Sequence, residues 1–156
     1  MCLATSEGSA SLEQAVAFEG ETGPYVQYTH ARACSVLRKA GLLSGHESTR
    51  EWVTTPLTGD KRIQPLEELD SLSYELMKTI SYFPEVRKRA INEADPSLVA
   101  KHILDVSQDF NRFYHEMPIL NAAPTEREFR LRLTDATRLT IRAALEILGI
   151  EHPVEI

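Results

Sequence analysis

Hydrophobic positions repeat most regularly between Asp95 and Pro118. They follow one another in alternating steps of four and three residues: Val99, Ile103, Val106, Phe110, Phe113 and Met117. This spacing places all of them on a single side of an α-helix. Asp95 and Pro96 suit the N-cap and the first position of that helix, and Pro118 cannot continue it. The pattern therefore predicts a long amphipathic helix with one buried face.

The N-terminal part predicts two helices separated by helix breakers. Ser11 can cap a short helix, which we expect to end at Gly20 and the Gly23–Pro24 pair. Pro24 then suits the first position of a new helix that runs to about Lys39 or Ala40. Gly41 is the expected stop of this second helix.

The remaining segments extend the helical pattern. Residues 41–65 are rich in Gly, Ser, Thr and Pro and predict a long loop, with room for a short helix around Trp52. Helices are expected over about 66–82, 84–94 and 126–148. Thr125 and Glu128 form a capping-box pair before the last helix, and Gly149 stops it. Its apolar or small positions are Phe129, Leu133, Ala136, Thr140, Ala143 and Ile147.

The pattern as a whole predicts an all-α fold. No segment of the sequence shows sustained alternation of apolar and polar residues with period two. We therefore expect a helical bundle of about five main helices. A length of 156 residues suits one domain.

Composition narrows the class of protein. Hydrophobic residues make up 42% and charged residues 26% of the chain, which is typical of globular proteins. The net charge of −6 argues against a protein that binds nucleic acid or membranes over its whole surface, although it allows a local basic patch. The two cysteines, Cys2 and Cys34, have no metal-like spacing. Without a signal-peptide pattern or a long apolar run, we expect a cytoplasmic protein that does not bind membranes.

Motifs for catalysis or for metal and cofactor binding are missing from the sequence. There is no Gly-rich phosphate loop followed by Lys-Ser/Thr, no Cys-x-x-Cys pair and no nucleophile elbow. His115 and Glu116 are adjacent and point about 100° apart on a helix, so we interpret them as a solvated helix end. The arginines of the last helix are interpreted as an ion-paired solvent face: Arg127, Arg130, Arg132, Arg138 and Arg142. Cys34 is expected to be buried.

Rings and a cation lie close together on the helix that begins near Pro24. Tyr25, Tyr28 and Arg32 fall within about 60° of one another at helical spacing, along the edge of a mostly apolar face. Tyrosines at such an edge commonly bury the ring and expose the hydroxyl. The same arrangement could stack unpaired bases and bind a phosphate. From spacing alone, the core-edge interpretation is favoured over RNA contact.

Three segments of the sequence, in the same order, resemble one family. "FEGETGPYVQYTHARACSVLRKA" is similar to the junction in arginyl-tRNA synthetases between the catalytic domain and the C-terminal helical domain. "ELMKTISYFPEVRKRAINEADPSLVAKHILDVSQDFNRFYHEMPIL" resembles the middle of that domain, and "REFRLRLTDATRLTIRAALEILGIEHPVEI" resembles its end. Asp135-Ala136-Thr137-Arg138 stands where the Asp-Ala-x-Arg signature names the DALR anticodon-binding domain.

The resemblance implies a fold, a partner and site residues. The fold would be a DALR-type helical bundle over residues 23–156, and residues 1–22 would be a remnant of the end of the catalytic domain. The partner would be the anticodon stem-loop of tRNA(Arg), with the central cytidine as its anchor. Residues at positions that contact RNA in this family are Tyr25, Tyr28, Arg32, Tyr114 and Ile156. Ile156 stands where the family often has a terminal Met, so this position departs from the family pattern.

The same comparison implies what this chain lacks. The His-Ile-Gly-His and Lys-Met-Ser-Lys signatures of class I synthetases do not occur. ATP and arginine, which the parent ligases use, would bind a catalytic domain elsewhere, so this chain should be inactive alone and have no cofactor or metal. A catalytic domain or partner chain could complete it. The alternative is a helical protein-interaction module that keeps the fold without binding RNA. A self-sufficient enzyme has the least support.

Overall fold

The computed structural model describes residues 8–43 and 68–155, with side chains for 23–43 and 68–155. Within these ranges the secondary structure is entirely helical, which confirms the predicted all-α class. The helices are α1 (Gly8–Lys39), α3 (Ser71–Ser81), α4 (Phe83–Glu93), α5 (Ser97–Glu116) and α6 (Pro124–Leu148). The predictions for the 41–65 loop beyond residue 43, for a helix at Trp52 and for Ile156 lie outside the described residues.

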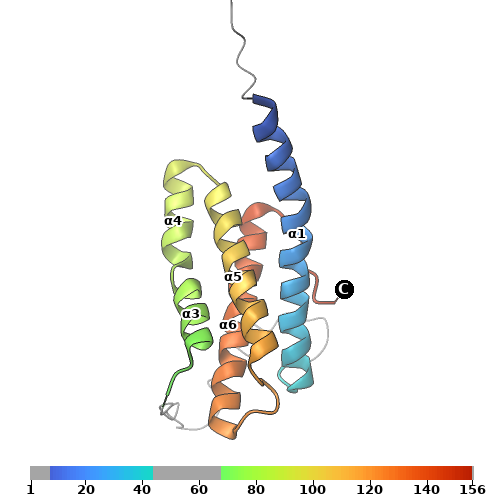
Figure 1. The fold of residues 1–156 in the computed structure, drawn as a ribbon, viewed down its shortest axis with the longest axis vertical. Coiled ribbons are helices and arrows are strands. Elements are labelled where there is room, and N and C mark those ends of the chain that lie inside the picture. The colour runs from blue at the N-terminus through green and yellow to red at the C-terminus, as the bar shows by residue number, and fades with distance from the viewer. Residues whose placement is uncertain (1–7, 44–67, 156) are drawn as a thin grey trace, which may run out of the picture.

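The described helices form a bundle with α5 and α6 in the middle (Figure 1). Helices α3 and α4 follow one another along one side, and α1 lies along the other. Helix α1 packs against both α5 and α6, and its N-terminal part extends beyond the ends of the other helices. The chain after α6 turns back beside α1, so residues from both ends of the described chain share one surface.

The predicted stripe of α5 is confirmed. Val99, Ile103, Val106, Phe110 and Phe113 are each at most 1% exposed. The first three join a core cluster with Val26 of α1 and Ile141 of α6, and the two phenylalanines join a second cluster with Leu37 and Leu131. Met117, at the end of the stripe, packs partly buried against the second cluster. Full burial of side chains of this size contributes about 1.5–3 kcal/mol each to stability.

Helix α1 contradicts the predicted break at Gly23 and Pro24. It is continuous from Gly8 to Lys39, with Pro24 inside it. A proline removes one backbone hydrogen bond, here the one to Gly20, but its own φ is helical. The helix can therefore continue when packing holds the following turns, as the burial of Val26 and Ala33 does here. The predicted stop is confirmed, since Gly41 has a φ of 75° just after the helix.

The start of α3 also differs from the prediction. The helix begins at Ser71, not near Leu66, because Asp70 is its N-cap. The Asp70 carboxylate accepts a hydrogen bond from the Ser73 backbone N–H at 2.7 Å, and a second from the Ser73 hydroxyl at 2.8 Å. Capping of this kind fixes where a helix starts.

Helix α6 corrects two predictions. Its N-cap is Ala123 and Pro124 is its first residue, so Thr125 lies inside the helix and the predicted capping box is wrong. The predicted solvent face of arginines is wrong for Arg130 and Arg138, which are buried, whereas Arg132 and Arg142 are partly exposed and ion-paired as predicted. Ile147, which was placed with the apolar positions, is 46% exposed. Because α1, α3 and α5 all pack on α6, its buried surface is much wider than one stripe. Gly149, with a φ of 70°, ends the helix as predicted.

Candidate nucleic-acid interface

The exposed edge of α1 carries the predicted rings and cation. Tyr28 is 55% exposed and Tyr25 is 36% exposed, whereas Val26 and Ala33 on the adjoining face are buried. The buried face packs on α5 and α6, so the tyrosines necessarily project along the rim of the bundle. Arg32, one turn after Tyr28, is partly buried. The predicted edge position of these three residues is confirmed, while their contact with RNA stays a prediction.

The C-terminal end of α5 brings Tyr114 to this edge. The guanidinium carbon of Arg32 lies 5.1 Å from the centroid of the Tyr114 ring, which is the geometry of a cation–π contact. Phe110, fully buried one turn earlier, lies against the Tyr114 ring with centroids 6.3 Å apart. The Tyr114 ring thus packs against the core residue Phe110, and the Arg32 cation is held over the ring.

Asn111 connects these groups and was not identified from the sequence. Its side-chain oxygen accepts a hydrogen bond from the Arg32 guanidinium. Its side-chain nitrogen lies 2.9 Å from the Tyr25 hydroxyl and 2.9 Å from the Thr29 hydroxyl. The sequence signal was its position three residues before Tyr114, which puts both residues on neighbouring turns of one helix face.

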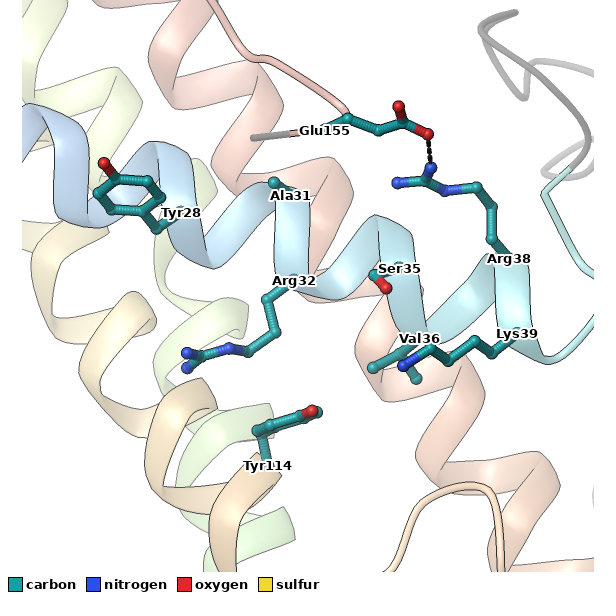
Figure 2. Close-up of a pocket in the computed structure, with 9 residues that line it drawn as sticks. All are labelled: Tyr28, Ala31, Arg32, Ser35, Val36, Arg38, Lys39, Tyr114 and Glu155. Atoms are coloured by element: carbon teal, nitrogen blue, oxygen red, sulfur yellow. Dashed lines mark hydrogen bonds and ion pairs between the residues drawn. The ribbon is translucent and has the colours of Figure 1, made fainter.

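These residues border a cavity of about 510 Å³ between α1, the end of α5 and the C-terminal tail (Figure 2). Its polar and aromatic lining comprises Tyr28, Arg32, Ser35, Arg38, Lys39, Tyr114 and Glu155. Figure 2 shows the Arg32 side chain reaching toward Tyr114, with Arg38 and Lys39 further along α1. Three cations, two phenol rings and one carboxylate therefore share one concave surface. Such a surface can stack a planar group and bind an anion beside it.

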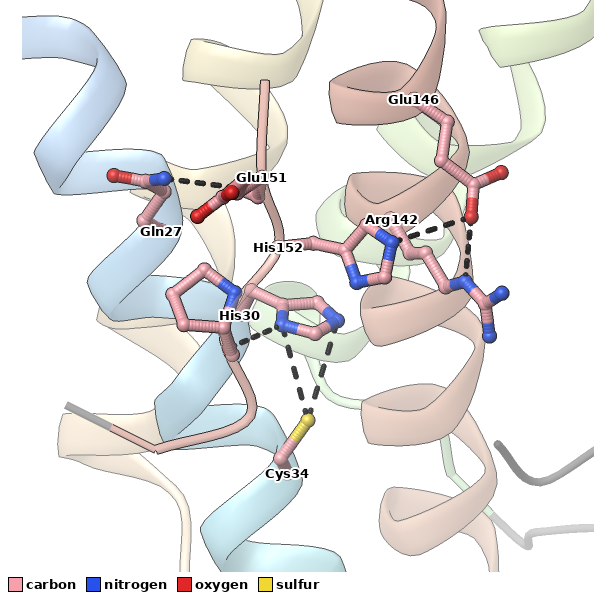
Figure 3. A network of polar contacts seen from close by, with 8 residues as sticks. Gln27, His30, Cys34, Arg142, Glu146, Glu151 and His152 are labelled. Carbon is pink, nitrogen blue, oxygen red and sulfur yellow. Dashed lines mark hydrogen bonds and ion pairs between the residues drawn. The ribbon is translucent and has the colours of Figure 1, made fainter. Parts of the chain in front are cut away.

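The C-terminal tail is attached to α1 through its backbone carbonyls (Figure 3). Gln27 donates to the Glu151 carbonyl at 2.8 Å, and His30 Nδ1 donates to the Pro153 carbonyl at 2.9 Å. Arg38 donates to the Val154 carbonyl at 2.5 Å and pairs with the Glu155 carboxylate. These contacts place Glu155 at the cavity. Ile156, the last predicted RNA contact, lies outside the described residues.

His30 is buried beneath this tail. It is 1% exposed, and its hydrogen bond to the Pro153 carbonyl fixes the Nδ1-protonated tautomer of the neutral ring. Burial lowers the pKa of His30 to about 4, and nearby His152, Arg138 and Arg142 act in the same direction. Cys34 is buried beside it, as predicted, with its sulfur 3.9 Å from His30 Nδ1, and burial raises the pKa of this thiol. His30 holds the tail, and neither His30 nor Cys34 lines the cavity.

The signature residues of α6 form a separate buried pair. Asp135 and Arg138 are 6% and 4% exposed, and Arg138 Nε and Nη2 lie 2.8 and 2.7 Å from one Asp135 carboxylate oxygen. Burial raises the pKa of Asp135, while the Arg138 cation opposes that rise. Neither side chain lines the cavity.

Other chemistry receives no support from the described parts of the chain. His115 and Glu116 are exposed at the end of α5, as predicted. Over residues 8–43 and 68–155, no group of His, Cys, Asp and Glu side chains could hold a metal ion. Among the helices described, none is both long and apolar enough to cross a membrane.

Comparison with known proteins points in one direction. The family model described as "DALR anticodon binding domain" matches residues 26–156. Arginine–tRNA ligase 1 of a Bacillus cereus strain is 41% identical over 145 residues, which are 93% of this chain and 23% of that protein. The arginine–tRNA ligase of Streptococcus equi subsp. equi is 42% identical over 144 residues, again with 23% of its length covered.

A solved structure agrees with these sequence matches. The arginyl-tRNA synthetase of Thermus thermophilus superposes with a TM-score of 0.68 and 30% sequence identity, covering 92% of this chain and 23% of that one. This chain therefore spans less than a quarter of the length of the ligases it resembles. Its helical fold matches that of their anticodon-binding domain.

Proposed function

This chain belongs to the DALR anticodon-binding domain family, and on that premise we propose that it binds the anticodon stem-loop of tRNA(Arg). The observation that carries the proposal is the meeting of Tyr28, Tyr114 and Arg32 at one cavity, with Arg38 and Lys39 beside them. Anticodon bases are unpaired and can be splayed out, stacked on aromatic rings and approached by arginine.

The groups have separate roles in this proposal. Exposed Tyr28 stacks an unpaired base, and Tyr114, which packs on Phe110 and lies under the Arg32 guanidinium, contributes to the cavity beside it. Arg32 meets a phosphate or a base edge, and the cations at the end of α1 attract the RNA backbone. Tyr25 adds a hydroxyl at the same edge, and Ile156 remains a proposed contact. The central cytidine of the anticodon is the base that we expect to be read.

The chain is proposed to be non-catalytic by itself. ATP-dependent activation of arginine and its transfer to tRNA would take place on a catalytic domain, in the cytoplasm, with residues 1–22 as the end of that domain and 23–156 as the anticodon-binding part. Purified chain should therefore not aminoacylate tRNA(Arg). Detection of charged tRNA above a no-protein control would contradict this part of the proposal.

Binding of purified protein to the tRNA(Arg) anticodon stem-loop tests the proposal directly. The native loop, a loop with the central base changed, and a Tyr28→Ala/Arg32→Ala double variant are compared at low and moderate salt. We expect the native loop to bind best, the double variant to lose that preference, and affinity to fall as salt rises. Equal binding of both loops by the wild-type chain would overturn anticodon recognition.

A protein-interaction module is the second candidate, and exposed apolar side chains favour it. Large apolar side chains are exposed on and beside α3 and α4: Leu69, Tyr74, Met77, Tyr82 and Ile91. Exposed apolar groups of this kind can mark an interface, and the net charge of −6 does not favour RNA. Binding to a protein through such a surface would respond little to salt, which separates the two candidates in the same titration.

A further inference from the structure

We propose that Asn111 is a positioning residue of the interface, which holds Arg32 beside Tyr114 and turns the Tyr25 hydroxyl into a hydrogen-bond donor for the RNA. The inference rests on the proposed function and adds to it a residue that does not line the cavity. It follows from the hydrogen bonds that join α5 to the exposed edge of α1.

The orientation of the Asn111 amide is determined by its partners. Arginine can only donate hydrogen bonds, so the amide oxygen must face the Arg32 guanidinium. The amide NH₂ group then faces the hydroxyls of Tyr25 and Thr29, each at 2.9 Å. Thr29 gives its own proton to the Tyr25 backbone carbonyl at 2.9 Å, so its oxygen is available to accept from Asn111. Both N–H groups of the Asn111 amide and the Thr29 hydroxyl therefore have an acceptor.

This arrangement fixes the direction of the Tyr25 hydroxyl. A phenol has one proton and an oxygen that accepts, and here the oxygen is occupied by the Asn111 NH₂ group. Among the described residues, no acceptor takes the Tyr25 proton in return. The side chain is 36% exposed, so the proton is available to an acceptor of the RNA, such as a base carbonyl or a phosphate oxygen.

The same amide restrains Arg32. A long arginine side chain has considerable rotamer freedom, and ordering it at an interface lowers affinity. Contact with the Asn111 oxygen on one side and the Tyr114 ring on the other limits this freedom before RNA arrives. One N–H group is used by Asn111, and the remaining donors of the fork can bind phosphate.

A double-mutant cycle on stem-loop binding tests the role of Asn111. Asn111→Ala should lower affinity for the native stem-loop about tenfold with a melting temperature within a few degrees of wild type. Tyr25→Phe should lower affinity about three- to fivefold in the wild-type background, and less than twofold when Asn111 is already alanine. Non-additivity is the signature of a residue that acts through Tyr25, and a general structural role would not produce it.

Asn111→Asp is the second variant, and it keeps the volume of the side chain. The carboxylate can still accept from Arg32, but it cannot donate, so the Tyr25 proton turns inward to it. We expect a folded protein that binds the stem-loop about tenfold more weakly. Gln108→Glu, one turn earlier on α5 and exposed, adds the same charge without touching the network and should cost about threefold or less.

The outcomes separate this inference from the function on which it rests. If wild-type protein does not prefer the native loop, the proposed function fails and the inference falls with it. If wild type shows the preference but Asn111→Ala and Asn111→Asp bind as tightly as wild type, Asn111 has no positioning role. Losses from Asn111→Ala and Tyr25→Phe that simply multiply would also overturn it.

Discussion

Two arginines of this bundle, Arg138 and Arg32, differ in whether the folded protein leaves hydrogen-bond donors of the guanidinium available to a ligand. Arg138 of α6 is 4% exposed and makes a close ion pair with Asp135, which is also buried. Arg32 of α1 is partly buried, held by one amide contact and one ring, and faces a cavity. Arg138 thus belongs to the interior, whereas Arg32 retains donors for a ligand.

The residues that define the family and the residues of the candidate ligand site therefore lie in different parts of the molecule. Asp135 and Arg138 form the signature after which the domain family is named, yet they lie inside the bundle. Burial of a charge is costly unless the charge is paired, so such a pair is sensitive to substitution even when it touches no ligand. We therefore expect changes in the signature to act on stability, and changes at the α1 edge to act on RNA affinity.

Asp135→Ala should have the largest effect. Removing the carboxylate leaves a buried guanidinium without the ion pair seen here, and changes of this kind cost about 3–5 kcal/mol. Urea denaturation measures the free energy of unfolding. Glu128→Ala is the matched control, because it removes a carboxylate that pairs with Arg132 at 2.8 Å on the exposed side of α6 and should cost at most about 1 kcal/mol.

One result for Asp135→Ala would contradict the expectation that the signature acts on stability alone. A variant that unfolds at the wild-type urea concentration but no longer binds the stem-loop would place Asp135 in the ligand site. The signature would then have a direct binding role that its burial conceals.

His30 is buried like Arg138, and its titration predicts how the free energy of unfolding depends on pH. Above pH 6.5 the ring is neutral in folded and unfolded chains, so its titration does not affect stability. Below pH 6.5 the unfolded chain binds a proton that the folded chain does not take up until about pH 4. The free energy of unfolding should therefore fall by up to about 3 kcal/mol as the pH decreases from 6.5 to 4.

His30→Asn isolates this contribution from that of other titrating groups. The Asn amide can take the place of the Nδ1–H donor to the Pro153 carbonyl and does not titrate. Urea denaturation of both proteins between pH 7.5 and 4 should show a shallower decrease for the variant. Parallel curves for the two proteins would mean that His30 is protonated in the folded state at the same pH as in the unfolded state.

Tyr28→Ala tests whether the exposed edge of α1 acts on RNA affinity. Loss of a base-stacking ring costs about 1–3 kcal/mol in RNA affinity. Stability should change by no more than about 0.5 kcal/mol, since the ring is 55% exposed. Fluorescence anisotropy with labelled stem-loop measures affinity. Tyr74→Ala removes a similarly exposed ring from α3, away from the cavity, and should leave affinity unchanged; equal losses from both variants would exclude specific stacking at Tyr28.

Periodicity predicted those parts of the fold where a helix has one buried face. The stripe of α5 was confirmed, since all of its buried residues except Ser107 lie on that stripe, although four helices pack on α5. Helix α6 differed because its buried residues extend around more of the helix and include Arg130 and Arg138, which find acids or carbonyls there. Pro24 misled in a similar way, since packing of the following turns sustains a helix that local rules would end.

The candidate site could be predicted only in part for a related reason. Tyr25, Tyr28 and Arg32 share one helix face, so their spacing was informative. Asn111 is 86 residues from Tyr25 along the chain, and no spacing rule links them. Tyr114 was assigned to the site by the family resemblance alone, because its cation–π contact with Arg32 depends on how α5 packs on α1.

Glu155 forms an ion pair with an arginine, as Asp135 does, but it lies at the cavity. Its substitution should have the smallest effect of the changes proposed. Its carboxylate pairs with Arg38 at the cavity, as Asp135 pairs with Arg138 in the interior, but the Glu155 side chain is 62% exposed. An exposed pair contributes at most about 1 kcal/mol and is easily exchanged for another anion. An RNA phosphate that reaches Arg38 must replace this carboxylate.

Glu155→Gln should therefore raise affinity for the stem-loop about two- to threefold, with little change in stability. The cation no longer has a competing carboxylate, so one additional phosphate contact should also steepen the slope of log K against log salt by about 0.7. Glu151→Gln removes the same charge from the tail outside the cavity lining, and it should change affinity less and leave the slope unaltered. If both variants raise affinity equally, Glu155 acts only through net charge, and Arg38, like Arg138, is committed to the fold and not to the RNA.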